Sequence, residues 1–177
     1  SGDRTSIKAT DSPWYIGSVE NSNRLFDGKI DEVRIWNNVR TPDEILDNYL
    51  AELTGSETNL VGYWKFNGTL LDETANGNDV VLTGNGSPVF DSVIATTTQE
   101  TTIEPIQSSA ASTESITQSS IDLEADLRQS LIIETANQTN LIMLSAFTIE
   151  AWINMESDLG FYEERTIVHR GRNGGAY

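Results

Sequence analysis

Short runs of β-branched and aromatic residues, separated by turns rich in Gly, Asn and Asp, recur along this chain. In residues 30–36, Val33 and Ile35 alternate with Glu32 and Arg34, the period of two that marks a half-buried strand. Comparable runs cover residues 14–18, 60–66, 80–82, 130–133, 147–153 and 166–169. Many short strands joined by such turns predict an all-β fold, an antiparallel β-sandwich of the jelly-roll type.

One segment changes from the strand period to a helical period. Thr41, Pro42 and Glu44 supply an N-cap hydroxyl, a proline at the first helical position and a carboxylate at the third. Apolar residues then follow at helical spacing, namely Ile45, Leu46, Tyr49, Leu50 and Leu53. We expect one short helix near residues 41–53, with these apolar residues on one side and its end at Gly55.

The charge balance excludes several classes of partner. The chain has 11 basic and 27 acidic residues, a net charge of −16. This excess opposes binding to nucleic acid or to an anionic membrane surface, and it favours cations or neutral sugars. Cysteine is absent, which excludes disulfides, thiolate metal sites and a cysteine nucleophile. No run of 18 apolar residues occurs, so we expect no direct membrane insertion.

Catalytic signatures are weak. His169 is the only histidine, no Gly-x-Ser-x-Gly elbow precedes a helix, and no phosphate-cradling glycine loop is present. With 27 acidic residues, some pair of carboxylates is inevitable, and Glu150 is better explained by pairing with an arginine or lysine across the sheet. We therefore expect that this chain is not an enzyme.

One loop gathers oxygen-bearing side chains within eight residues: Asp72, Asn76, Asn78 and Asp79. Carboxylate and amide oxygens are the ligands that calcium accepts, so these four residues form a candidate calcium site. The spacing differs from that of an EF-hand, and Asn-Gly-Asn-Asp is also ordinary turn chemistry. Asp31 is a further oxygen donor, and we expect it to accept hydrogen bonds at a strand edge.

Exposed aromatic rings could bind the flat apolar faces of sugars. Trp14, Trp64 and Trp152 lie in three of the predicted strands and are the candidate ligand-binding residues. The alternative is that these rings fill the core of the sandwich, where most aromatic side chains of such folds lie.

Several of these segments resemble laminin-G-like modules, the concanavalin A-like jelly rolls found in tandem in bacterial surface proteins. Trp14–Ser18, Phe26–Asn37 and Arg40–Ile45 are similar to the C-terminal third of such a module. Leu60–Asn67, with the Asp72–Asp79 loop behind it, is similar to a segment that opens a module or bridges two. Phe147–Ile153 and Thr166–Val168 are similar to the family's early central strands.

The order of these segments departs from the family pattern, because the late strands precede the early ones. The resemblance implies that residues 1–56 end one module, 57–95 form bridging or opening strands, and 121–177 begin the next module. Residues 96–120 are rich in Ser and Thr and are expected to be a linker or a long loop. A circularly permuted module is the alternative. An incomplete jelly roll would expose strand edges, so we expect strand exchange with a neighbour or aggregation.

The resemblance implies a non-catalytic extracellular binding or adhesion module of a large bacterial surface or secreted protein. Its partners would be a glycan or a cell-surface protein, together with adjacent modules of the same polypeptide, and calcium would assist binding. Two alternatives remain: a structural spacer in a stalk or filament, or an accessory carbohydrate-binding domain of a secreted hydrolase.

Overall fold

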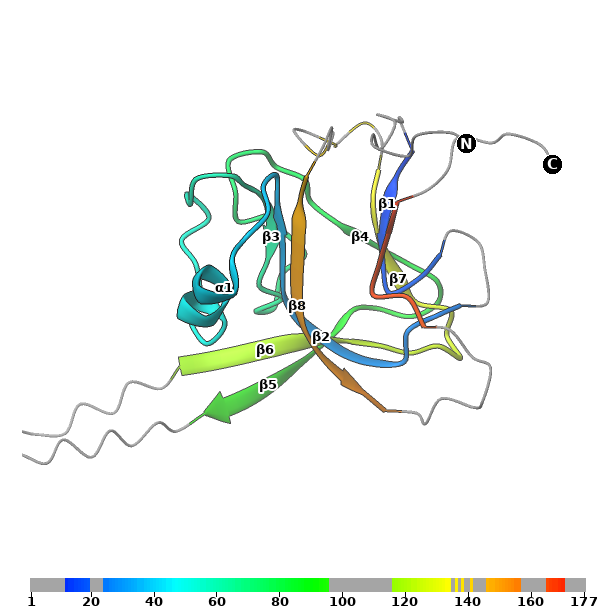
Figure 1. Cartoon of the computed structure of the whole chain (residues 1–177). Coiled ribbons are helices and arrows are strands. Elements are labelled where there is room, and N and C mark those ends of the chain that lie inside the picture. Colours follow the sequence, from blue (N-terminus) through cyan, green and yellow to red (C-terminus); the bar gives the residue numbers. More distant parts are fainter. Residues whose placement is uncertain are drawn as a thin grey trace, which may run out of the picture.

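The computed structural model describes residues 12–19, 24–95, 116–134, 136, 138, 141, 146–156 and 165–170. Within these ranges it contains nine strands and one short helix. The strands form two antiparallel sheets (Figure 1), and one core cluster contains side chains from both of them. The predicted antiparallel β-sandwich with one short helix is therefore confirmed.

The first sheet has four strands. Their order is β4 (Val81–Thr83), β7 (Ser130–Ile133), β1 (Trp14–Ile16) and β9 (Val168–Arg170). β1 thus lies between two strands that come from the last third of the chain (Figure 1). Segments that the sequence analysis assigned to two successive modules pair here within one sheet.

The second sheet is built around β2 (Gly28–Trp36). On one edge, β2 pairs with β6 (Ile116–Leu123) through residues 28–30 and with β3 (Leu60–Trp64) through residues 33–36. Its other edge pairs with β8 (Thr148–Met155) along the whole strand. β5 (Val89–Ala95) continues the sheet beyond β6.

A β-bulge in the middle of β2 explains this change of partner. Ile30 and Val33 both lie in the core, although a spacing of three places them on opposite faces of a regular strand. The register against β8 shifts between Asp31 and Arg34, and Glu32 has a left-handed backbone with φ of 51°. One inserted residue therefore brings Val33 and Ile35 back to the core face.

The core lies between the two sheets and is almost wholly apolar. Burying each large side chain contributes about 1.5–3 kcal/mol, so this cluster is the main source of stability. Its buried members are Trp14, Ile16, Phe26, Ile30, Val33, Ile35, Val61, Trp64, Phe66, Val80, Ile121, Leu123, Leu131, Ile133 and Leu141.

The helix α1 (Pro42–Asn48) begins as predicted. The Thr41 hydroxyl accepts a hydrogen bond from the Glu44 amide at 3.3 Å, and the Glu44 carboxylate accepts one from the Thr41 amide at 2.7 Å. This reciprocal capping box satisfies two amides that the first helical turn leaves without partners. The hydrogen bonds to Thr41 also lower the pKa of Glu44.

The end of α1 differs from the expectation. The helix stops at Asn48, and Leu46, Tyr49 and Leu50 are exposed, so the predicted apolar stripe is wrong for these residues. The helix ends at this point because of Arg34. Its guanidinium donates hydrogen bonds to the carbonyls of Asn48 and Ala51, which holds the chain where a further helical turn would have formed. Leu53 alone is buried, in a second cluster with Trp36, Leu60 and Tyr63.

The Ser/Thr-rich segment also differs from the expectation at its C-terminal end. Residues 116–120 form the first part of β6 and pair with β5, while residues 96–115 lie outside the described part of the chain. The sequence analysis predicted neither β5 nor this half of β6. Its residues, Ile-Thr-Gln-Ser-Ser, carry too few apolar side chains to show a strand period, because backbone pairing alone requires no particular side chain.

Candidate binding site

The predicted calcium residues lie in the loop that joins β3 to β4. The buried Asp72 carboxylate accepts four hydrogen bonds there. The amides of Tyr63, Thr74 and Asn78 donate to it at 2.9–3.0 Å, and the Thr74 hydroxyl donates at 2.9 Å. A carboxylate has about four lone-pair sites, so these donors use the accepting capacity of Asp72 in full.

The other three residues close the same loop. The side-chain amides of Asn76 and Asn78 donate to the Val61 carbonyl at 3.2 and 2.9 Å, and Asp79 accepts from the Asp72 amide at 2.8 Å. As arranged, these side chains do not fit a calcium site, since a cation would have to replace the donors bound to Asp72. Calcium at this loop stays a prediction.

The structure brings together another acidic group that the sequence analysis missed. The carboxylates of Asp122, Glu124 and Glu156 lie within 4.8 Å of one another. Burial, followed by the charge of Glu156, raises the pKa of Asp122, and burial, followed by the charge of Asp122, raises that of Glu124. Asp122 lies in β6 and Glu124 directly follows that strand, whereas Glu156 directly follows β8. Glu156 is therefore far from the other two residues in the sequence, and no local motif predicts the group.

Two of the three candidate tryptophans are core residues. Trp14 is 4% exposed and Trp64 is fully buried, so neither presents a ring to a ligand. The Trp64 indole donates to the Asn78 carbonyl at 3.0 Å, which binds the β3–β4 loop to the core. The expectation of ligand stacking is therefore corrected for Trp14 and Trp64, because both point to the inner face of their sheets.

Trp152 points to the opposite face of its sheet and is 46% exposed. Phe147, Ile149 and Ala151 alternate with it and pack on the core, as the predicted strand period requires. One face of the Trp152 ring stacks on Tyr49 at a centroid distance of 5.9 Å, and its indole donates to the Tyr49 carbonyl at 2.9 Å. The ring is thus held in a fixed orientation beside the end of α1.

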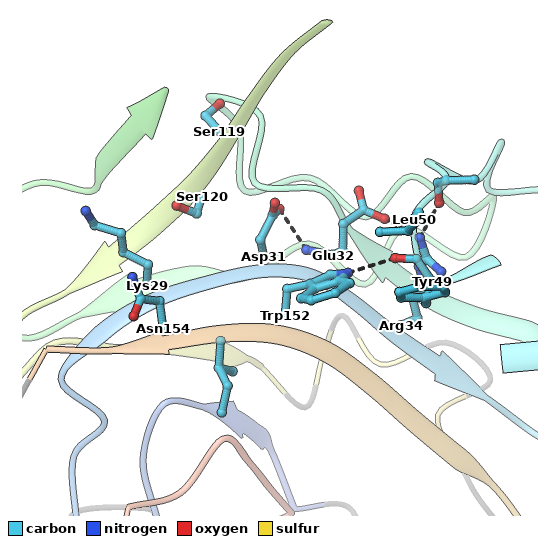
Figure 2. Close-up of a pocket in the computed structure, with 12 residues that line it drawn as sticks. Lys29, Asp31, Glu32, Arg34, Tyr49, Leu50, Ser119, Ser120, Trp152 and Asn154 are labelled. Atoms are coloured by element: carbon cyan, nitrogen blue, oxygen red, sulfur yellow. Dashed lines mark hydrogen bonds and ion pairs between the residues drawn. The ribbon is translucent and has the colours of Figure 1, made fainter. Parts of the chain in front are cut away.

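Trp152 forms one side of a groove of about 380 Å³, which we call the Asp31 groove. β2 contributes Asp31 to it, and Figure 2 shows this side chain between Trp152 of β8 and the β6 strand that carries the serines. Its lining includes the polar and aromatic residues Asp31, Tyr49, Ser119, Ser120, Trp152 and Asn154. The groove opens at the bulge, where β6 leaves β2 and β3 has not yet joined it.

A buried network holds the deep side of the groove. Arg34 is 2% exposed and forms an ion pair with Glu32, and the Tyr63 hydroxyl donates to the Glu32 carboxylate at 2.7 Å. The Tyr63 hydroxyl also accepts a hydrogen bond from the Leu53 amide at 3.1 Å. Burial, together with the bond to Glu32, raises the pKa of Tyr63, which keeps this hydroxyl protonated.

Glu150 extends the network from β8. It lies opposite Arg34 in the sheet, with 3.7 Å between the two side chains, and 3.3 Å from the guanidinium of Arg40. The predicted pairing of Glu150 with a cross-strand arginine is thus confirmed. Burial raises the pKa of Glu150, and the two arginines oppose that effect.

Asp31 has far fewer partners than the other acids near the groove. Its Oδ1 accepts one hydrogen bond, from the Glu32 amide at 2.8 Å, which confirms its predicted role as an acceptor, although β2 is an inner strand of the sheet. In the described part of the chain it forms no ion pair. Burial raises the pKa of Asp31 to about 7, and the charges of Glu32 and Glu52 add to the effect. The Glu32 amide and Arg34 act in the opposite direction.

The basic residues of the groove are already paired. Lys29 lies 2.6 Å from Asp91 and 3.7 Å from Glu156, and the bond to Asp91 is the main cause that raises the pKa of Lys29. Arg34 is paired with Glu32 and Glu150. Asp31 is therefore the carboxylate in the groove whose charge no cation balances at contact distance.

Of the groove residues, the sequence indicated Trp152 as a candidate ligand contact and Asp31 as a hydrogen-bond acceptor, and it gave no sign of Tyr49, Ser119, Ser120 and Asn154. Tyr49 was expected in the apolar stripe of the helix, and both serines in the Ser/Thr-rich linker. The one signal that could have located the groove is the spacing of Ile30 and Val33, which breaks the period of two and marks the bulge.

Comparison with known proteins gives one match. The model of the Laminin_G_3 family, in the concanavalin A-like lectin/glucanases superfamily, matches residues 1–46. No curated protein and no solved structure is significantly similar to this chain. Among the described residues, no helix has the length and apolar character needed to cross a membrane. The match confirms the resemblance over about a quarter of the chain, since residues 1–46, which contain β1, β2 and the start of α1, are similar to the laminin-G-like model.

Proposed function

We propose that this chain is a non-catalytic module that binds carbohydrate in the Asp31 groove. The observation that carries the proposal is the half-exposed Trp152 ring, fixed against Tyr49 beside a carboxylate and two serines. A sugar ring has an apolar face and a polar edge, and a binding site needs a flat aromatic surface next to a few fixed polar groups. The superfamily match supports a module that binds carbohydrate or protein.

The carboxylates of the groove support binding rather than glycoside hydrolysis. Hydrolysis requires two carboxyl groups free to act on opposite sides of the scissile bond. Glu32 is held by the Tyr63 hydroxyl and by Arg34, and Glu150 lies between Arg34 and Arg40. Asp31 is left as a single acid without a partner carboxylate available for that chemistry.

We further propose that the module acts outside the cell, as part of a large bacterial surface or secreted protein, where its ligands are cell-surface glycans. The support for this location is the laminin-G-like match, since modules of that family are often extracellular. A spacer role would leave the groove without a ligand, so binding data separate the two functions.

A glycan array tests the proposal, with the whole chain compared with Trp152→Ala and Leu71→Ala. Leu71 is 55% exposed in the β3–β4 loop and does not line the groove, so it is the matched control for loss of an exposed apolar side chain. We expect Trp152→Ala to weaken glycan binding at least ten-fold while Leu71→Ala binds normally. A chain that melts cooperatively and binds no glycan would overturn the proposal and favour the spacer.

Calcium at the β3–β4 loop is a separate prediction from the sequence, and thermal unfolding tests it. A cation that binds the folded state raises the melting temperature by mass action. A higher melting temperature in excess calcium than in chelator, abolished by Asp79→Asn, would support a site at the β3–β4 loop. Equal melting temperatures would contradict it and leave the loop closed by hydrogen bonds alone.

A further inference from the structure

The Asp31 groove combines three features on one wall of the sheet: an aromatic surface, unengaged polar groups and one unbalanced negative charge. The first is Trp152 with Tyr49, and the second includes the Ser120 hydroxyl and the Asn154 amide, which have no hydrogen-bond partner within the described residues. The third is Asp31, whose second carboxylate oxygen accepts no hydrogen bond there. Figure 2 shows Asp31 next to Trp152, on the side of the sheet that faces Ser119 and Ser120.

From this arrangement we propose that the groove selects amino sugars, with the Asp31 carboxylate as the ion-pair partner of the sugar's ammonium group. The inference rests on the proposed carbohydrate-binding function and narrows its ligand. A charge-assisted hydrogen bond between ammonium and carboxylate is about twice as strong as a neutral one. An ammonium close to the Trp152 ring also gains a cation–π contribution.

Charge in and around the groove supports a cationic ligand. Lys29 and Arg34, the two basic residues that line the groove, each contact at least two acidic groups. The whole chain carries a net charge of −16, which attracts cations to its surface. A ligand with a carboxylate or sulfate would instead place a second negative charge beside Asp31.

The electrostatics of Asp31 itself are those of a carboxylate that lacks a cation. Burial is the main cause of its raised pKa, Glu32 and Glu52 repel its ionised form, and Arg34 compensates only in part. An ammonium bound at hydrogen-bond distance would reverse this balance and lower the pKa of Asp31. Binding of the cation and ionisation of Asp31 would therefore favour each other.

A sugar fits the remaining groups better than a lysine side chain does. Both ligands offer an apolar surface and an ammonium group. The stem of a lysine has no group that could bond to the Ser120 hydroxyl or the Asn154 amide, whereas the ring hydroxyls of a sugar bond to both types of partner. The polar rim of the groove therefore favours the amino sugar.

Titration calorimetry at pH 6.5 tests the proposal with two oligosaccharides that share one backbone. Oligomers of glucosamine carry ammonium groups, and the N-acetylglucosamine oligomers of equal length do not. We expect the whole chain to bind the glucosamine form at least ten-fold more tightly, and rising salt to reduce that difference. In Asp31→Asn, which keeps the shape of the side chain, the two oligomers should bind within about two-fold of each other. Asp47→Asn, an exposed change on α1, should leave the preference intact.

The outcomes separate this inference from the function on which it rests. Equal binding of both oligomers, lost in Trp152→Ala, would overturn the amino-sugar selectivity and keep the groove as a carbohydrate site. Binding of Nα-acetyl-lysine amide as tight as that of the glucosamine oligomer would overturn it in favour of a protein ligand. No binding of any sugar on the array or in the calorimeter would overturn both proposals.

Discussion

Asp72 is a buried aspartate and Asp31 a half-buried one, and they differ in what their carboxylates contact. Asp72, in the loop after β3, accepts four hydrogen bonds and closes that loop on the sheet. Asp31, at the bulge of β2, accepts one and forms no ion pair in the described part of the chain. Asp72 is part of the cluster of polar residues that is conspicuous in the sequence, whereas Asp31 lines the candidate binding site.

The difference teaches that a functional candidate is marked by unused bonding capacity rather than by the number of polar residues. Hydrogen bonds within a loop can consume all the oxygens that a motif seems to offer to a ligand. A carboxylate held with a single donor and no paired cation is unfavourable to the fold, and it gains most from a ligand that supplies more of both. The two aspartates should therefore respond to mutation with opposite signs.

The largest effect is expected from Asp72→Ala. The change leaves the buried amides of Tyr63, Thr74 and Asn78 without their acceptor, and the free energy of unfolding should fall by about 3–4 kcal/mol. Chemical denaturation at pH 7 measures the loss. Glu73→Ala is the control, because Glu73 is its exposed neighbour, and it should stay within about 0.5 kcal/mol of the parent chain. A loss as small as that of the control would show that Asp72 does not close the loop.

Tyr63→Phe should have the next largest effect. The hydroxyl donates to Glu32 and accepts from the Leu53 amide, so its removal leaves the buried Leu53 amide without its acceptor and takes one of its two partners, the other being Arg34, from the Glu32 carboxylate. We expect a loss of about 2 kcal/mol, measured by the same denaturation. The groove should also lose part of its ligand affinity, because Glu32 would no longer be fixed beside Asp31. A variant with unchanged stability would mean that water replaces the hydroxyl.

Asp31→Asn should raise the free energy of unfolding, whereas Asp72→Ala should lower it. This difference in sign is the sharpest test of the comparison between the two aspartates. The pKa of Asp31 is about 7 in the fold, above the value near 3.8 of a free aspartate, so its ionised form is disfavoured in the folded state. The parent chain therefore loses stability as pH rises from about 4 through 7, and the neutral asparagine avoids that loss. We expect a gain of roughly 1 kcal/mol at pH 8, after allowance for solvent screening, and almost none at pH 4.

Thermal unfolding of Asp31→Asn and of the parent chain at both pH values measures this effect. Asp47→Asn removes one negative charge from the exposed side of α1 and controls for the change in net charge. If Asp31→Asn gained the same stability at pH 4 as at pH 8, the gain could not come from the charge of Asp31, and the groove would lose its main electrostatic feature.

Thr41→Ala should have an effect no larger than that of Asp31→Asn, since the capping box stabilises a short and exposed helix. Loss of the hydroxyl removes one bond to the Glu44 amide and should cost about 1 kcal/mol. Because Tyr49 follows α1 and stacks on Trp152, the affinity for a glycan should fall slightly as well. Thr41→Ser, which keeps the hydroxyl, should restore both values. Failure of the serine to do so would assign the effect to the lost methyl group.

The sequence predicted the parts of the fold that carry an apolar period. Local spacing and charge predict the core positions of Val33 and Ile35 in β2 and of Ile149 and Ala151 in β8, and they predict the capping box of α1 and the pairing of Glu150 with an arginine. The groove could not be predicted, because it depends on the point at which β6 leaves β2. That point lies where Ser119 and Ser120 pair with β5, and no side-chain pattern in the sequence records this register.

The burial of Trp14 and Trp64 could not be predicted from the sequence either. Both were reasonable ligand contacts by composition, but the face of a strand is decided by the partner sheet that covers it, and here that sheet buries them. Trp152 stays exposed because the end of α1, rather than a second sheet, borders its outward face.

The position of β1 has a consequence for how the chain is made. Residues 14–16 pair only with β7 and β9 among the described strands, and both lie more than a hundred residues later in the chain. During synthesis, the apolar Trp14 and Ile16 must therefore wait for most of the chain to be translated before their sheet can form. Pairing between residues so distant in the sequence slows folding, and apolar segments that are prone to aggregation stay exposed until it is complete. Yield in a cell should thus depend on translation rate and on chaperones more than the stability of the finished fold would suggest.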